Sequence, residues 1–315
     1  MAEIEILDDQ SGTTRRTRAR LRLDDGQELA VFIKRPSRSP IARAFVAVPR
    51  LGQAEVRFYT ELRDQVPIAT PHCHGADRFW RGFMVVLEDL TDSGATLRSS
   101  TDAITSDEAA SLLASLAAMH QQWWGRTELH PWLALNPRRE QKLGALLSPS
   151  LCRLGLWRVG SAVPEPLHQA ISRYARNRRA AQEAMSAGPT TLIHNDCHPG
   201  NQFVAADGRP GLIDWQLCRA GPWARDVAYL LATSLEPETR QSTEKDLLAD
   251  YLNQLGPVAP TVEEAWLAYR RNVVYAVEAM LVTAAVGVMM PKSTSTTLVS
   301  RAARAAADLD SFGAL

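Results

Sequence analysis

Hydrophobic and polar residues alternate along the first part of the chain and follow helical spacing after about residue 100. Residues 17–23 alternate between arginine and mostly apolar side chains, which is the period of a half-buried strand. An Asp25-Gly26 turn then leads into the apolar run at residues 29–33. This pattern predicts a β-hairpin that ends at Lys34.

One helix interrupts the β-rich region. Residues 53–65 carry apolar side chains at helical spacing and are followed by Pro67, whereas residues 83–87 are uniformly apolar and predict a buried strand. Thr105 with Glu108 three residues later forms a capping box, which predicts the start of a long helix. Further helical patterns occupy residues 171–185, 244–255, 263–288 and 298–309. We therefore expect a small β-rich N-terminal lobe, residues 1–90, and a larger helical lobe, residues 91–315.

Composition narrows the classes of function. The chain has 315 residues, 35 Lys and Arg against 35 Asp and Glu, and a pI near 7.1, so no global charge attracts nucleic acid. The N-terminus lacks a signal-peptide pattern, and the longest apolar stretch, residues 279–290, is too short to cross a membrane. Four scattered cysteines fit a reducing compartment. We expect a cytoplasmic protein without membrane insertion or nucleic-acid partners; the oligomeric state stays open.

Residues 192–216 carry the most informative polar pattern, because short apolar strands and turns here alternate with His194, Asp196, Asn201 and Asp214. Phosphoryl transfer needs a carboxylate that orients the attacking hydroxyl and oxygen ligands that hold a divalent metal. Asp196 is the candidate for the first role, and Asn201 and Asp214 are hard oxygen ligands suited to Mg²⁺. Taken alone, the motif also fits ordinary loop residues and a core histidine.

Two upstream residues strengthen the phosphotransferase interpretation. Lys34 ends a predicted strand and Glu55 lies on the predicted helix. A kinase uses a lysine and a glutamate in this order to form an ion pair that directs the lysine at the α- and β-phosphates. Five polar residues thus occur in the order that a kinase requires, which makes a chance match a weak explanation: Lys34, Glu55, Asp196, Asn201 and Asp214.

The motifs HNDCHPGN, IDW and RDVAY resemble the catalytic loop, metal-binding aspartate and following structural aspartate of the aminoglycoside phosphotransferase and choline kinase superfamily. The resemblance covers nearly the whole chain. Within this superfamily, six segments are most similar to the ecdysteroid-kinase-like branch and its bacterial relatives: SGTTRRTRARLRL, EVRFYTEL, VVLEDL, AAMHQQWW, IDWQ and YRRNVVY. The resemblance to the superfamily implies the bilobal α+β fold of protein kinases, with ATP and Mg²⁺ as cofactors and a small-molecule alcohol as acceptor.

The resemblance also implies roles for individual residues. Asp226 is expected to support the catalytic loop. His194 and His198 join Asp196 in the catalytic group, although His198 fits a hydrogen bond within the loop equally well. The nucleotide site is expected to include the phosphate loop and the adenine-binding segment after residues 83–87, at Ser11, Gly12, Thr13, Glu88 and Leu90. The loop has a single glycine, and Gln216 stands where many superfamily members have Glu.

Several further residues have ordinary explanations. His72-Cys73-His74 lies in an expected connection and lacks a second cluster that would complete a zinc site. Cys197 follows Asp196 and is expected to be within reach of thiol reagents if its loop lines a cleft. His120 falls on an apolar helix face and is expected in the core. The arginines at 173–179 fit a solvated helix face or an anionic acceptor.

The charge of the helical insert bears on the acceptor. Residues 101–190 contain 10 Lys and Arg against 7 Asp and Glu, a net charge of +3. A cationic acceptor requires an acidic or aromatic pocket, so a neutral or anionic hydroxylated acceptor is favoured over an aminoglycoside or choline. Two alternatives stay open: a kinase acting on Ser or Thr of a peptide, and a pseudokinase that binds nucleotide without catalysis.

Overall fold

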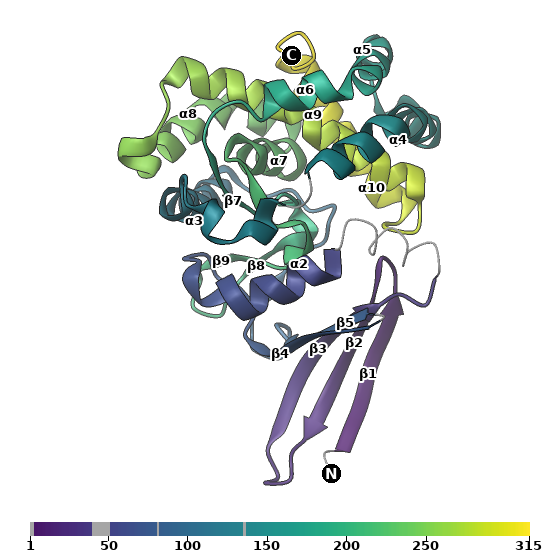
Figure 1. Cartoon of the computed structure of the whole chain (residues 1–315), viewed down its shortest axis with the longest axis vertical. Coiled ribbons are helices and arrows are strands. Elements are labelled where there is room, and N and C mark those ends of the chain that lie inside the picture. Colours follow the sequence, from purple (N-terminus) through teal and green to yellow (C-terminus); the bar gives the residue numbers. More distant parts are fainter. Residues whose placement is uncertain (1–2, 40–50, 81, 135–136) are drawn as a thin grey trace. The chain divides into compact units, whose positions relative to one another are not determined.

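The structure, a computed structural model, describes residues 3–39, 51–80, 82–134 and 137–315. The chain forms two compact units: unit 1 comprises Met1–Leu97 and Gln202–Cys218, and unit 2 comprises Arg98–Asn201 and Arg219–Leu315 (Figure 1). Unit 1 is built on β-sheet and unit 2 is mainly helical. The predicted bilobal α+β fold is therefore confirmed. The segment that contains Asp214 belongs to unit 1, although it lies far along the chain.

The sheet of unit 1 is antiparallel, with the strand order β1-β2-β3-β5-β4. Its strands are β1 (Glu3–Ser11), β2 (Thr14–Arg22), β3 (Glu28–Pro36), β4 (Cys73–Phe79) and β5 (Gly82–Glu88). The predicted hairpin is β2 and β3, in which Arg16 lies opposite Lys34. The expectation of a connection at residues 72–74 is wrong for Cys73 and His74, which begin β4. This edge strand is mostly exposed and therefore lacks a strong apolar alternation.

The predicted helix at residues 53–65 is confirmed. It consists of α2 (Leu51–Arg57), a π-helical turn (Phe58–Leu62) and a 3₁₀ turn (Arg63–Gln65). The helix packs closely on β5, because a Cβ atom at Gly52 would lie 2.1 Å from the Phe83 ring. This approach brings Glu55 into the interior, where it is fully buried.

A smaller sheet completes unit 1 and supports Asp214. Its order is β6-β8-β9, formed by β6 (Thr96–Leu97), β8 (Gln202–Val204) and β9 (Pro210–Leu212). Asp214 follows β9 and precedes a 3₁₀ turn (Trp215–Leu217). The Trp215 ring stacks on Phe58 at 3.9 Å between centroids, which ties this turn to the helical segment containing Glu55.

Unit 2 contains eight α-helices among its described residues (Figure 1), together with short 3₁₀ turns and a two-stranded sheet. The helices are α3 (Ser106–Trp123), α4 (Pro137–Val159), α5 (Glu165–Arg176), α6 (Arg178–Met185), α7 (Ala224–Ser234), α8 (Pro237–Leu255), α9 (Val262–Val286) and α10 (Lys292–Asp308). The strands are β7 (Thr190–Ile193) and β10 (Arg219–Pro222). The capping box at the start of α3 is confirmed.

The helical spacing of apolar residues did not predict α7 or α4, and it predicted one helix where the structure has both α5 and α6. α7 is buried along its whole length, so it shows no polar face that would reveal its period. α4 has Pro149 in its interior and leaves several leucines exposed, which hides its buried face. The single helix expected at residues 171–185 is α5 and α6, separated at Asn177.

The core of unit 2 forms around α7, which packs against α3, α8, α9 and α10. α4 approaches α9 at Gly155, where a Cβ atom would lie 2.4 Å from the Leu281 carbonyl oxygen. The β7–β10 pair lies beside α3 and carries the chain into the segment that contains Asp196. Within the ranges that the structure describes, no helix is long and apolar enough to cross a membrane.

Candidate active site

The structure places the predicted site residues in two groups, one in each unit. In unit 1, Lys34 projects from β3 and its Nζ lies 2.6 Å from Glu55 Oε1 and 2.8 Å from Asp214 Oδ1. The Lys34 and Glu55 side chains are 3% and 0% exposed. The sequence predicted this lysine–glutamate pair from order alone, and the packing of α2 on β5 brings the two residues together.

The charge on Lys34 is maintained by its two carboxylate partners. Burial by itself lowers the pKa of the ammonium group, but the negative charges of Asp214 and Glu55 outweigh it, so the pKa stands above its ordinary value. Lys34 is therefore a fixed positive charge. Such a group can bind a phosphate without changing its protonation state.

Asp214 adopts a left-handed backbone conformation, with φ of 64°, immediately after β9. The next residue fixes this turn, because Trp215 Nε1 donates to the Leu212 carbonyl oxygen at 3.0 Å. Gln216 is buried, and its Oε1 has no hydrogen-bond partner in the described part of the chain. Carboxylate and amide oxygens, such as those of Asp214 and of Gln216 two residues later, are of the chemical type that Mg²⁺ prefers.

The predicted phosphate loop is the tight connection between β1 and β2. Ser11 ends β1, and the Gly12 N–H donates to the Thr14 carbonyl oxygen at 3.0 Å. That N–H group is therefore engaged within the turn. Beyond the loop, sequence reasoning missed Arg16, whose Nη2 lies 3.4 Å from Asp214 Oδ2.

The predicted adenine-binding segment lies at the end of β5. The Glu88 N–H donates to the His72 carbonyl oxygen at 2.9 Å, and the Asp89 N–H donates to the Ala30 carbonyl oxygen at 3.2 Å. The Glu88 carboxylate accepts a hydrogen bond from the His72 N–H at 2.7 Å. Leu90 is buried. Because these two N–H groups and the Glu88 carboxylate already have partners, an adenine ring would use other backbone groups of this segment.

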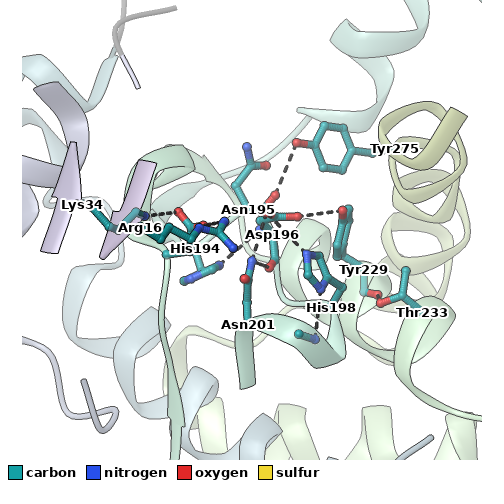
Figure 2. Close-up of polar contacts among 12 residues, drawn as sticks. Arg16, Lys34, His194, Asn195, Asp196, His198, Asn201, Tyr229, Thr233 and Tyr275 are labelled. Carbon is teal, nitrogen blue, oxygen red and sulfur yellow. Dashed lines mark hydrogen bonds and ion pairs between the residues drawn. The ribbon is translucent and has the colours of Figure 1, made fainter. Parts of the chain in front are cut away.

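In unit 2, the Asp196 carboxylate is held from two sides (Figure 2). Tyr229 Oη donates to Oδ1 at 2.8 Å, and Asn201 Nδ2 donates to Oδ2 at 3.0 Å and to the Asp196 carbonyl oxygen at 2.9 Å. These bonds fix the direction of the carboxylate. The Asn201 bonds use the amide nitrogen, so the amide oxygen is the atom with which this residue could bind a metal.

Asp226 supports the backbone that leads to Asp196. It is fully buried and accepts hydrogen bonds from the N–H groups of His194 and Asn195, both at 2.7 Å. Burial raises its pKa, but the hydrogen bond and charge of His120 and the neighbouring donors outweigh this, and the pKa is lowered. Asp226 therefore holds a charged acceptor beneath Asn195, whose φ of 71° is left-handed.

The two histidines predicted beside Asp196 have hydrogen bonds within their own loop. His194 is fully buried, and its Nδ1 accepts from the Asp196 N–H at 3.2 Å. His198 Nδ1 accepts from the Gly200 N–H at 3.1 Å, while its Nε2 lies 3.9 Å from Asp196 Oδ2. Both histidines thus shape the loop around Asp196, and direct roles in the chemistry stay predictions.

Three other expectations can be compared with the structure. Cys197 is fully buried and burial raises its pKa, so the expected access of thiol reagents is wrong in the folded state. His120 is a core residue, as predicted, with Nδ1 2.7 Å from Tyr251 Oη. Among the arginines at 173–179, Arg178 is not a solvated charge, because its Nε lies 2.6 Å from Glu278 Oε1.

Sequence reasoning also missed three residues in unit 2 as parts of this site. Tyr229 lies three residues after Asp226, and one helical turn places both on the same face of α7; this spacing could have indicated it. Tyr275 Oη donates to the Asn195 carbonyl oxygen at 3.4 Å, and the Arg225 guanidinium lies 4.5 Å from the Tyr275 ring centre. The first contact joins α9 to the loop before Asp196 and the second joins α9 to α7, and neither has a local sequence signal.

Comparisons with known proteins identify the family of the chain. The model of the phosphotransferase enzyme family matches residues 11–266. The chain belongs to this family. Its membership confirms the prediction of an enzyme that transfers phosphate to a hydroxyl group, and of a fold shared with the aminoglycoside phosphotransferase and choline kinase superfamily. None of the curated proteins searched matches the chain.

Solved structures resemble the fold at low identity. An ethanolamine kinase from Plasmodium vivax has a TM-score of 0.56 and 11% identity, covering 96% of this chain and 82% of its own. Choline kinase LicA from Streptococcus pneumoniae has a TM-score of 0.53 and 14% identity, covering 96% and 94%. A microcompartment-associated aminopropanol kinase has a TM-score of 0.55 and 15% identity, covering 98% and 91%. The narrower resemblance to the ecdysteroid-kinase-like branch stays a prediction.

Proposed function

We propose that this phosphotransferase uses ATP and Mg²⁺ to phosphorylate a hydroxyl group of a neutral or anionic small molecule. The observation that carries the proposal is the buried Lys34, held by Glu55 and Asp214 in unit 1. A lysine fixed by two carboxylates is costly to bury. A buried lysine of this kind is explained if its positive charge binds an anionic ligand.

On the donor side, Lys34 binds the α- and β-phosphates. Glu55 holds Lys34 Nζ at 2.6 Å and thereby fixes the direction of the ammonium group. Bound Mg²⁺ would neutralise charge that develops on the phosphates, with Asp214 and Asn201 as its protein ligands. Support for these ligands comes from their oxygen chemistry and from the unpartnered Oε1 of Gln216, two residues after Asp214 in the sequence.

On the acceptor side, Asp196 orients the hydroxyl group and receives its proton as the phosphate is transferred. Tyr229 and Asn201 donate to different oxygens of Asp196, so the carboxylate cannot rotate freely. Fixed geometry of this kind contributes to phosphoryl transfer because little covalent assistance is required from the protein. Asp226 keeps the backbone at His194 and Asn195 in place.

Charges near Tyr275 support an acceptor that is not cationic. Burial, with the negative charges of Asp196 and Glu278, raises the pKa of Tyr275 to about 12, while the positive charges of Arg225 and Arg219 oppose this increase. Arg225 is buried, and its Nε has no hydrogen-bond partner among the described residues. The nearby Glu278 is paired with Arg178. Because Asp196 is assigned to the acceptor hydroxyl and Glu278 is paired with Arg178, the remaining charges around Tyr275 are those of Arg225 and Arg219, and they favour a neutral or anionic acceptor over an ammonium group.

The alternative of a peptide kinase has less support. The residues that follow Asp214 form the 3₁₀ turn Trp215–Leu217 and then β10, which pairs with β7. Asp226 comes soon afterwards in α7. This segment is too short and too regular to provide an extended platform for a peptide, and we therefore favour a small molecule.

The test is a mass-spectrometric screen of the purified protein with ATP, Mg²⁺ and a panel of cationic, neutral and anionic alcohols. We expect a product that gains one phosphate from a neutral or anionic alcohol, with Asp196→Asn reducing kcat by roughly 10²–10⁴-fold. Asp207→Asn, at an exposed carboxylate, serves as the control. Equal rates for wild type and Asp196→Asn would contradict the role of Asp196. Nucleotide binding without turnover on any alcohol or peptide would favour the pseudokinase alternative.

A further inference from the structure

Two cations from neighbouring strands share the Asp214 carboxylate. Arg16 in β2 lies directly opposite Lys34 in β3, so their side chains leave the same face of the sheet. Lys34 Nζ lies 2.8 Å from Asp214 Oδ1, and Arg16 Nη2 lies 3.4 Å from Asp214 Oδ2. Like charges directly opposite each other destabilise an antiparallel pair. The position of Arg16 opposite Lys34 is explained by the Asp214 carboxylate, which both side chains contact.

The two cations differ in how firmly they are held. Lys34 is 3% exposed and has short contacts with two carboxylates. Arg16 is 46% exposed and has one long contact with Asp214. An ion pair of such an exposed side chain contributes little stability. Arg16 can therefore leave Asp214 at small cost, whereas Lys34 cannot.

Metal binding at Asp214 would make the present position of Arg16 unfavourable. A divalent cation on this carboxylate adds positive charge where Lys34 and Arg16 already lie. The phosphates of a bound nucleotide supply the negative charge that rebalances the site. A guanidinium group offers five N–H donors in a planar arrangement that matches phosphate oxygens.

The phosphate loop itself supplies a reason for an additional donor. It has one glycine, and the Gly12 N–H already donates to the Thr14 carbonyl oxygen. Loops that bind phosphates commonly use such backbone N–H groups. Arg16 stands two residues after Thr14 and brings a charged donor to the same end of the β1–β2 pair.

We propose that Arg16 is a phosphate-binding residue of the nucleotide site, which contacts Asp214 when no nucleotide is present and binds the β- and γ-phosphates of a nucleoside triphosphate. This inference rests on the proposed use of ATP and Mg²⁺. It adds a side-chain contact with the phosphates that the catalytic-loop motifs do not indicate.

The test compares the affinities of Arg16 variants for a non-hydrolysable ATP analogue and for AMP, each with Mg²⁺, by calorimetry. We expect Arg16→Gln to weaken binding of the triphosphate by roughly 10- to 100-fold, as for lost charge-assisted hydrogen bonds, and to change AMP binding less than about twofold. Arg16→Lys should restore part of the lost affinity. Arg22→Gln, which removes an exposed arginine from the same strand, should bind as wild type does.

The possible results separate this inference from the proposed function. If wild type binds neither ligand, the proposed function fails. If wild type binds the triphosphate and Arg16→Gln binds it equally well, only the role of Arg16 is overturned. A loss of the same size for AMP and the triphosphate would show a structural effect and would also overturn it. Thermal unfolding of each variant checks that the fold is retained.

Discussion

Replacing Asp226 gives the most direct test of how the Asp196 loop is held. The carboxylate is fully buried and accepts two backbone hydrogen bonds at 2.7 Å, from His194 and Asn195. His120 Nε2 lies 3.3 Å away and is its third partner. Asp226→Ala leaves both backbone donors without an acceptor in the interior. Asp226→Asn keeps one acceptor oxygen and removes the charge.

The expected loss follows from these contacts. A hydrogen bond to a charged group contributes about 1.5–3 kcal/mol, and Asp226→Ala removes two such bonds, from the His194 and Asn195 N–H groups. Because removal of the charge also relieves its desolvation, we expect Asp226→Ala to lower the free energy of unfolding by about 3–5 kcal/mol. For Asp226→Asn, which retains one acceptor, we expect about 1.5–3 kcal/mol.

The pH dependence provides an independent check. The folded pKa of Asp226 is lowered, so its stabilisation is fully present above the unfolded pKa of about 3.9 and is lost as the pH falls through the folded pKa. The difference between wild type and Asp226→Asn should therefore shrink below about pH 4.

Urea unfolding combined with hydrogen exchange at the His194 and Asn195 amides measures both effects. Asp250→Asn, on the exposed side of α8, is the matched control and should change stability by less than about 0.5 kcal/mol. The reasoning is refuted if Asp226→Ala costs less than about 1 kcal/mol and leaves exchange at both amides unchanged.

Two further predictions concern buried groups. Lys34→Met leaves the fully buried Glu55 carboxylate without its cation, so we expect the free energy of unfolding in urea to fall by about 3–5 kcal/mol. The double variant Lys34→Met/Glu55→Leu should recover part of this loss. A double variant no more stable than the single one would contradict the reasoning. In native protein treated with iodoacetamide, we expect Cys73 to be alkylated before Cys197, because Cys73 is half-buried and Cys197 is fully buried. Peptide mass spectrometry measures the order of labelling. Labelling of Cys197 first would disprove the prediction.

Local patterns accounted for much of the fold and for the main site residues. The capping box at Thr105 and Glu108 and the hairpin of β2 and β3, which runs to Pro36 rather than to Lys34 as predicted, depend on neighbouring residues, so the sequence expresses them directly. α7 was missed because its burial on all sides removes the amphipathic period. β4 was missed because an exposed edge strand lacks apolar alternation.

The order of polar residues by itself determined the class of chemistry. Lys34, Glu55, Asp196, Asn201 and Asp214 have side chains suited to binding phosphate and metal, and their spacing could be read without coordinates. Only the tertiary structure decided which other side chains join them. Arg16 reaches Asp214 through strand register, and Tyr229 reaches Asp196 through the packing of α7. Such contacts join residues distant in sequence, and no local periodicity records them.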